Sequence, residues 1–286
     1  MSTNAGGETR EEREAVVVVR PATPGRLVFA SPHSGEWYPD DLGADPALPP
    51  VSLRSAEDAL VDRLITAGPA HGATLVLARF GRAYVDLNRD PTDLDPQLIE
   101  GLDHPASPRS AAGYGVLPRL TGDGRSLYAR RLTPDEARVR LERAHTPWHA
   151  ALTAEMEAAR ARYGSAILID WHSMPERATR APGGPRGPDV VLGDRHGSSC
   201  TAELTRTLRA AFETLGWRVA LNHPYAGGWT TQSRGRPDEG FHAIQIELNR
   251  ALYYDEAERR PGIGWSRTLK GVSRVIAALS TADLKA

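Results

Sequence analysis

The chain is poor in cysteine, in lysine and in long apolar runs, and each shortage excludes a class of protein. Its single cysteine, Cys200, excludes an internal disulfide and is typical of a reducing compartment. No window reaches the roughly 18 apolar residues of a membrane-spanning helix. The polar N-terminus also lacks the apolar segment of a secretory signal. We therefore expect a cytoplasmic protein that does not associate with membranes.

Neither sign of charge is in excess. The 35 lysines and arginines nearly balance the 36 aspartates and glutamates, which gives a net charge of −1. A nucleic-acid-binding surface would need a basic excess, so we expect no nucleic-acid partner. Arginine dominates the basic residues, and its planar guanidinium group suits the binding of a small anionic ligand.

Strand-like and helix-like segments alternate along the chain. Strands are expected at residues 26–30, 73–78, 83–87, 166–170, 189–192, 217–221 and 243–248. Helices are expected at residues 55–67, 133–163 with a kink at Pro147, 199–215 and 266–280. This alternation predicts a three-layer α/β fold, with a mixed, mostly parallel sheet between helices.

The remaining segments complete the expected organisation. Residues 1–14 are highly charged and predict a disordered tail, so that residues 15–286 form a single domain. Residues 91–131 and 223–240 are rich in glycine and proline and are expected to be loops. Loops of that length in a compact domain usually serve function.

Two histidines and a glutamate follow expected strands, where ligands gather in open α/β sheets. His33 and Glu36 stand three residues apart in a turn, and His172 follows a later strand. An imidazole and a carboxylate at that spacing can bind one cation, and His172 could add the third ligand of a catalytic zinc site. The alternatives are a surface pair of His33 and Glu36, and a hydrogen-bonded core position for His172.

Glu247 interrupts an otherwise apolar strand, between Ile246 and Leu248. Burial of a carboxylate is costly unless the group is paired or functional. Glu247 is therefore either a functional carboxylate or the partner of a nearby arginine.

Asn88 and Arg89 offer amide and guanidinium donors that suit a carboxylate ligand. The alternative is that Arg89 forms a structural ion pair with Asp86 or Asp90.

Five segments, taken together and in order, resemble the N-formylglutamate amidohydrolase family. They are Ser31–Gly35, Tyr84–Pro91, Asp170–Pro175, Pro224–Gly228 and Gln245–Tyr253. The resemblance implies a fold similar to the zinc carboxypeptidases, with one zinc ion bound by His33, Glu36 and His172. It also implies that Glu247 is the general base.

The same resemblance implies how the substrate is held. Asn88 and Arg89 match the pair that binds the substrate carboxylate, and Arg82 matches an arginine that polarises the scissile carbonyl. Tyr225 and Arg236 are expected to contact the substrate. The loop around Arg236 departs from the family pattern.

We therefore expect a zinc-dependent amidohydrolase that acts on a small acidic N-acyl substrate, N-formyl-L-glutamate first, to release formate and glutamate. A carboxypeptidase or another N-acyl amino acid deacylase would use the same site. A non-catalytic protein that binds carboxylate ligands is the alternative from another class.

Overall fold

The computed structural model describes residues 14–179 and 186–282. Nearly all of the expected disordered tail, residues 1–13 of 1–14, lies outside the described residues. None of the helices in these two described ranges is long and apolar enough to cross a membrane.

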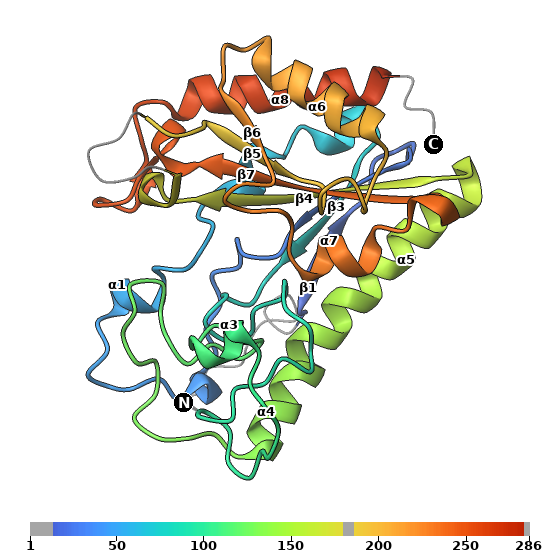
Figure 1. Cartoon of the computed structure of the whole chain (residues 1–286). Coiled ribbons are helices and arrows are strands. Elements are labelled where there is room, and N and C mark those ends of the chain that lie inside the picture. Colours follow the sequence, from blue (N-terminus) through green and yellow to red (C-terminus); the bar gives the residue numbers. More distant parts are fainter. Residues whose placement is uncertain (1–13, 180–185, 283–286) are drawn as a thin grey trace, which may run out of the picture.

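A mixed sheet of seven strands forms the centre of the molecule (Figure 1). Its strands, in spatial order, are β1 (Val16–Val19), β3 (Thr74–Ala78), β2 (Leu27–Ser31), β4 (Ala166–Met174), β7 (Phe241–Asn249), β5 (Val190–Gly193) and β6 (Val219–Leu221). The four strands from β3 to β7 are parallel neighbours. β1 is antiparallel to β3, and β5 is antiparallel to β7. This confirms the expected mixed, mostly parallel sheet.

Helices cover both faces of the sheet (Figure 1). One face carries α2 (Val61–Leu64), α6 (Ala202–Glu213) and α8 (Trp265–Thr281). The other carries α5 (Thr146–Tyr163) and α7 (Trp229–Arg234), and α4 (Pro134–Arg140) precedes α5 beyond the sheet. The short helices α1 (Pro50–Leu53) and α3 (Pro108–Ala111) lie in a loop-rich region beside α4, and β8 (Tyr254–Asp255) pairs with β9 (Arg260–Pro261). Short 3-10 turns occupy Asp40–Leu42, Gly68–His71, Glu176–Thr179, Pro237–Glu239 and Arg250–Leu252.

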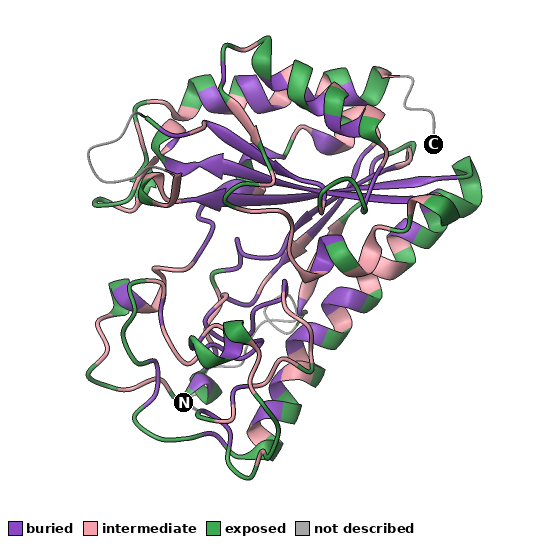
Figure 2. Ribbon diagram, viewed as in Figure 1, coloured by how far each residue is buried: buried purple, intermediate pink, exposed green. Residues whose placement is uncertain are grey.

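The two central strands are buried along their whole length, as Figure 2 shows. On one face of β4, Ile167 and Ile169 join the apolar core beneath α6 and α8. On the other face, Ala166 and Leu168 join the core that includes α5. Alternation of side chains across a strand explains why one apolar run serves two cores.

The expected long helix at 133–163 is confirmed, with one irregular turn. Thr133 and Glu136 form a reciprocal capping box at its start. A π-helical turn at Leu141–His145 separates α4 from α5 just before Pro147. Pro147 has no N–H for the carbonyl four residues back, and the wider turn accommodates its ring.

Four features of the local structure differ from expectation. The helix expected at 55–67 is limited to Val61–Leu64, and the strand expected at 83–87 is an irregular turn. The strand β1 and the helix α7, which lies within the expected loop 223–240, were not foreseen. The apolar side chains of residues 83–87 are buried. Burial in the core, rather than pairing in a sheet, therefore accounts for the apolar character of this segment.

Candidate active site

The face of the sheet that packs against α5 changes from apolar to polar toward the carboxyl ends of its strands. On β4 the change falls between Leu168 and Asp170, and on β7 it falls between Ala243 and Gln245. The strands are parallel and in register there, because Asp170 lies beside Gln245. Two neighbouring strands therefore bring polar side chains to one place, as expected for a ligand site in an α/β sheet.

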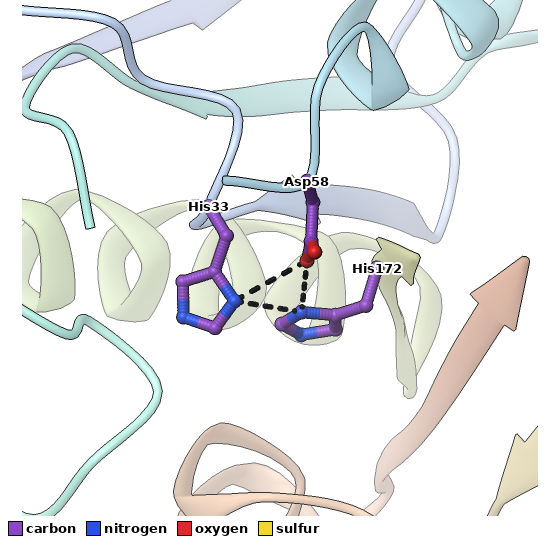
Figure 3. A group of neighbouring side chains, drawn as sticks. All are labelled: His33, Asp58 and His172. Atoms are coloured by element: carbon purple, nitrogen blue, oxygen red, sulfur yellow. Dashed lines mark hydrogen bonds and ion pairs between the residues drawn. The ribbon is translucent and has the colours of Figure 1, made fainter. Parts of the chain in front are cut away.

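His33, Asp58 and His172 converge beside this edge (Figure 3). His33 lies just after β2, Asp58 belongs to the irregular segment before α2, and His172 belongs to β4. Asp58 Oδ2 lies 3.0 Å from His172 Nδ1 and 3.3 Å from His33 Nδ1. The two Nδ1 atoms are 3.1 Å apart. All three side chains are at most 2% exposed.

Each histidine has a carboxylate on its other ring nitrogen. His33 Nε2 donates to Asp86 Oδ1 at 2.7 Å. His172 Nε2 lies 3.0 Å from Asp170 Oδ2 and 3.2 Å from Asn88 Nδ2. Carboxylates in this outer position orient metal-binding histidines and make the inner nitrogen a better ligand.

A positive charge would stabilise this convergence of two imidazole nitrogens and a carboxylate oxygen. With its proton on Nε2, His33 presents a lone pair from Nδ1 to a carboxylate oxygen and to His172 Nδ1. Burial raises the pKa of Asp58, but the interactions with His172 and His33 bring it well below its usual range. Tetrahedral zinc ligands lie about 3.3–3.4 Å apart, given zinc–ligand distances of about 2.0–2.1 Å. The residues present therefore fit a metal ion.

Arg250 and Ser173 hold the oxygen of Asp58 that faces away from the histidines. Arg250 donates to Asp58 Oδ1 at 3.0 Å, and Ser173 Oγ donates to the same oxygen at 3.2 Å. Arg250 also donates to Ser173 at 3.0 Å. These bonds leave Oδ2 free to face the cluster.

The structure does not bring Glu36, the expected third ligand, to the two histidines. The turn after β2 directs Glu36 outward, where its half-exposed carboxylate lies 3.0 Å from Arg54. Asp58 takes the position instead. The apolar spacing of residues 55–67 predicts an amphipathic helix and does not single out Asp58, whereas the chain around Asp58 is irregular.

Glu247 lies next to the cluster, because the register of β4 and β7 pairs it with His172. Burial raises the pKa of Glu247 to about 7, against the opposing charge of His172. Within the described residues its carboxylate forms no ion pair, which disfavours the alternative role as an arginine partner. Its Oε1 accepts from Gln245 Nε2 at 2.8 Å, and Gln245 Oε1 accepts from Gly228 N at 2.8 Å.

A cavity of about 520 Å³ opens over the cluster and Glu247. Its walls come from the expected loops 91–131 and 223–240 together with the strand ends. Arg82 lines it, and its guanidinium group donates twice to Asp86 Oδ2, at 2.9 and 3.0 Å. A volume of this size suits a small molecule.

Asn88 and Arg89 also line the cavity. Arg89 donates to the carbonyl oxygens of Tyr114 and Asn88, at 3.1 and 3.0 Å. Its Nε is 3.9 Å from Asp86 Oδ2, and Asp90 bonds to other groups. Arg89 is thus within ion-pair distance of Asp86, as one alternative held, but it donates no hydrogen bond to Asp86 or Asp90.

His145 and His149 hold the backbone on both sides of Asn88. His145 Nε2 lies 3.0 Å from the carbonyl oxygen of Arg89, and His149 Nε2 lies 2.9 Å from that of Leu87. Trp229 packs against both rings. The π-helical turn ends at His145 and sets where that ring lies along the helix.

The two remaining expected substrate contacts differ in position. Tyr225 lines the cavity, and burial raises the pKa of its hydroxyl. Arg236 does not line it: its half-exposed guanidinium group lies 2.9 Å from Glu239 and over the ring of Phe241. The bend of the chain at Pro237–Glu239 turns Arg236 away from the site.

This layout defines the class of protein as an α/β protein with a candidate metal centre at the carboxyl edge of its sheet. The N-formylglutamate amidohydrolase family profile matches residues 25–254. The chain belongs to the N-formylglutamate amidohydrolase family.

Individual relatives agree with this assignment. The chain is 34% identical over 233 residues to an N-formylglutamate deformylase of Pseudomonas aeruginosa, covering 80% of this chain and 82% of the relative. It is 33% identical over 190 residues to an N-formylglutamate deformylase of Pseudomonas putida, covering 65% and 66%. The crystal structure of the N-formylglutamate amidohydrolase from Ralstonia eutropha JMP134 superposes with a TM-score of 0.87 at 34% identity, over 93% of this chain and 97% of that one. A gene product of Agrobacterium tumefaciens, 22% identical over 96% and 98% of the two chains, shares the fold with a TM-score of 0.59.

Proposed function

We propose that this protein binds one zinc ion and hydrolyses N-formyl-L-glutamate to formate and glutamate. The observation that carries the proposal is the convergence of two imidazole nitrogens and one carboxylate oxygen beside a buried glutamate. Two relatives are named N-formylglutamate deformylases, which supports this substrate.

The donor set favours zinc among the common cations. Two nitrogen ligands and one oxygen ligand leave an open position, as in catalytic zinc sites, whereas calcium and magnesium prefer oxygen ligands alone. Zinc bound there would act as a Lewis acid and lower the pKa of a coordinated water toward about 7. If His172 bound the ion through Nδ1, its proton would lie on Nε2, beside Asp170.

Glu247 is assigned the role of general base. Its carboxylate accepts a proton from the attacking water and delivers that proton to the amide nitrogen as the carbon–nitrogen bond breaks. A pKa of about 7 suits both steps, because the group can take up and release a proton near neutral pH. Gln245 fixes the carboxylate by its 2.8 Å hydrogen bond.

Two arginines are assigned to the substrate. Arg82, anchored on Asp86, stabilises the negative charge that develops on the formyl oxygen. Arg89, with Asn88 beside it, binds a carboxylate of the substrate and so places the amide against the reacting groups. Both assignments rest on the position of these side chains in the cavity wall.

Metal analysis and a substrate panel test the proposal. We expect about one zinc per chain, loss of activity on chelation, and recovery when zinc is restored. N-formyl-L-glutamate should be turned over faster than N-acetyl-L-glutamate or dipeptides. Preference for dipeptides would favour a carboxypeptidase, and binding of the formyl compound without turnover would favour a non-catalytic binding protein.

A further inference from the structure

The arginines that line the cavity differ in whether a carboxylate of the protein is already bound to them. Arg82 and Arg250 are bonded to Asp86 and Asp58. In the described part of the chain, Arg195 has no carboxylate within ion-pair distance, and its guanidinium group donates to the carbonyl oxygen of Gly227 at 3.3 Å. A half-buried guanidinium group that satisfies only a backbone carbonyl keeps most of its donors for a ligand.

The backbone at Arg195 is held in a conformation that ordinary side chains rarely adopt. Arg195 has a φ of 54°, and its neighbours His196 and Asn222 have φ values of 57° and 58°. Left-handed backbone at non-glycine residues costs free energy and persists where surrounding bonds impose it. Such positions cluster at functional sites, so this turn invites a functional explanation.

A dense set of hydrogen bonds imposes that conformation. Arg195 N donates to the carbonyl oxygen of Ala226 at 2.8 Å. Asp194 Oδ1 accepts from Asn222 Nδ2 at 2.8 Å and from Gly197 N at 2.9 Å. Asn222 Oδ1 accepts in return from Asp194 N at 3.1 Å. The turn after β5 is thus locked to the loop that lines the cavity.

Two glycines in that loop allow it to contact both arginine-bearing segments closely. A Cβ at Gly227 would lie 3.2 Å from Cδ of Arg195. A Cβ at Gly228 would lie 2.4 Å from Nδ2 of Asn88, too close for any side chain. The same short stretch of backbone therefore supports Arg195 and the segment that carries Arg89.

We propose that Arg195 binds the second carboxylate of a dicarboxylate substrate, namely the side-chain carboxylate of the N-acyl glutamate. The assignment rests on the proposed function, in which Arg89 binds the α-carboxylate. Asn88, the neighbour of Arg89, contacts His172 of the cluster, whereas Arg195 follows β5, two strands from β4. Two strand spacings are roughly 10 Å. The carboxylate nearer the amide therefore goes to Arg89, and the more distant one goes to Arg195.

Single amide substitutions in the substrate separate the two arginines. Wild type should discriminate against both N-formyl-L-glutamine, which lacks the side-chain carboxylate, and N-formyl-L-isoglutamine, which lacks the α-carboxylate. For Arg195→Ala we expect kcat/KM for N-formyl-L-glutamate to fall about 30-fold or more, while that for N-formyl-L-glutamine stays within about threefold of wild type. For Arg89→Ala we expect kcat/KM for N-formyl-L-glutamate to fall, while that for N-formyl-L-isoglutamine stays close to wild type. Zinc content should be unchanged in both variants.

Arg109 provides the matched control, because it lines the same cavity from an exposed position on α3. Arg109→Ala should keep the wild-type preference for N-formyl-L-glutamate over N-formyl-L-glutamine. If Arg109→Ala loses that preference and Arg195→Ala keeps it, the assignment to Arg195 is overturned. An equal fall on both substrates in Arg195→Ala would likewise reduce Arg195 to a structural role.

A binding measurement separates this inference from the proposed function. Glutarate has two carboxylates and no amide, whereas butyrate has one carboxylate on a similar chain. By calorimetry, Arg195→Ala and Arg195→Gln should bind glutarate about tenfold or more weakly than wild type and bind butyrate equally well. Unchanged glutarate affinity would overturn the role of Arg195 even in an active enzyme. If the Arg195 variants lose glutarate affinity but wild type does not hydrolyse N-formyl-L-glutamate, the proposed reaction is refuted and the role of Arg195 stands.

Discussion

The cavity has two halves that differ in burial and in backbone. In the strand half, His172 and Glu247 lie on β4 and β7, which are buried along their whole length, and His33 and Asp58 lie on irregular segments but are at most 2% exposed. In the loop half, Arg89 and Arg195 lie on irregular segments, and both residues are partly exposed. Central strands give the fixed geometry that bond-breaking chemistry needs, and loops can vary in the ligand that they select. We therefore assign reaction type to the strand half and substrate choice to the loop half.

Disruption of the cluster should have the largest effect. Asp58→Asn and His172→Ala should each lose zinc and lower kcat/KM by about 10³-fold or more, since a metal ion supplies several kcal/mol of transition-state stabilisation and each 1.4 kcal/mol is tenfold. Metal content and turnover measure this. Glu36→Gln is the control and should keep zinc and activity. If Glu36→Gln loses zinc and Asp58→Asn retains it, the arrangement seen here is not the one that binds metal.

Substitution of Glu247 should come next and should leave metal bound. Glu247→Gln should lower kcat by roughly 10²–10⁴, the usual contribution of a general base. The ionised carboxylate is the active form, so wild-type activity should fall as the pH drops below the pKa of Glu247. That pKa is about 7 without a metal, and a bound cation lowers it. The fall in wild-type activity on the acid side of the pH profile should therefore lie at or below pH 7. The residual activity of Glu247→Gln should not show this fall.

The loop half should respond mainly in substrate affinity. His149→Phe removes the donor to the carbonyl oxygen of Leu87, and a buried carbonyl left without a partner costs about 1–3 kcal/mol. We expect KM for N-formyl-L-glutamate to rise severalfold, with a smaller change in kcat, because the segment that carries Arg89 loses its support. His149→Gln can still donate and should restore KM. A fall in kcat alone would show that the two halves are not separate.

The same histidine predicts how stability depends on pH. Burial, with the nearby charges of His145 and Arg234, lowers the pKa of His149 to about 2. An unfolded chain binds a proton there below about pH 6.5, whereas the folded chain does not. The contribution to stability is thus present above pH 6.5 and is lost as the pH falls, by up to about 1.4 kcal/mol per pH unit. Between pH 7.5 and pH 5, the free energy of unfolding measured in urea should fall less in His149→Gln than in wild type.

The smallest effect is expected at Arg236. Its side chain lies outside the cavity, in an exposed pair with Glu239. Arg236→Gln should change kcat/KM less than about twofold and the free energy of unfolding by less than about 0.5 kcal/mol. A large rise in KM would place Arg236 on the substrate after all and would extend the loop half beyond the walls described here.

By itself, the sequence determined the parts of this protein that follow from local pattern. The apolar runs around Ile167 and Ile244 specified central strands, and the polar residues that end or interrupt those runs, His172 and Glu247, are the ones that meet at the sheet edge. The capping residues at Thr133 specified the start of a helix. The ordered motifs that surround these residues were sufficient to indicate the family.

Only the tertiary structure decided which side chains surround those residues. Asp58 lies 114 positions from His172 in sequence and reaches it through an irregular segment, so no spacing rule links the two. Glu36 had a plausible spacing from His33, but the turn after β2 points it to solvent. Arg195 reaches the cavity because distant residues hold its turn in a left-handed conformation. Local pattern fixes how a segment packs, whereas the direction of a loop side chain depends on contacts that form only when the whole chain has folded.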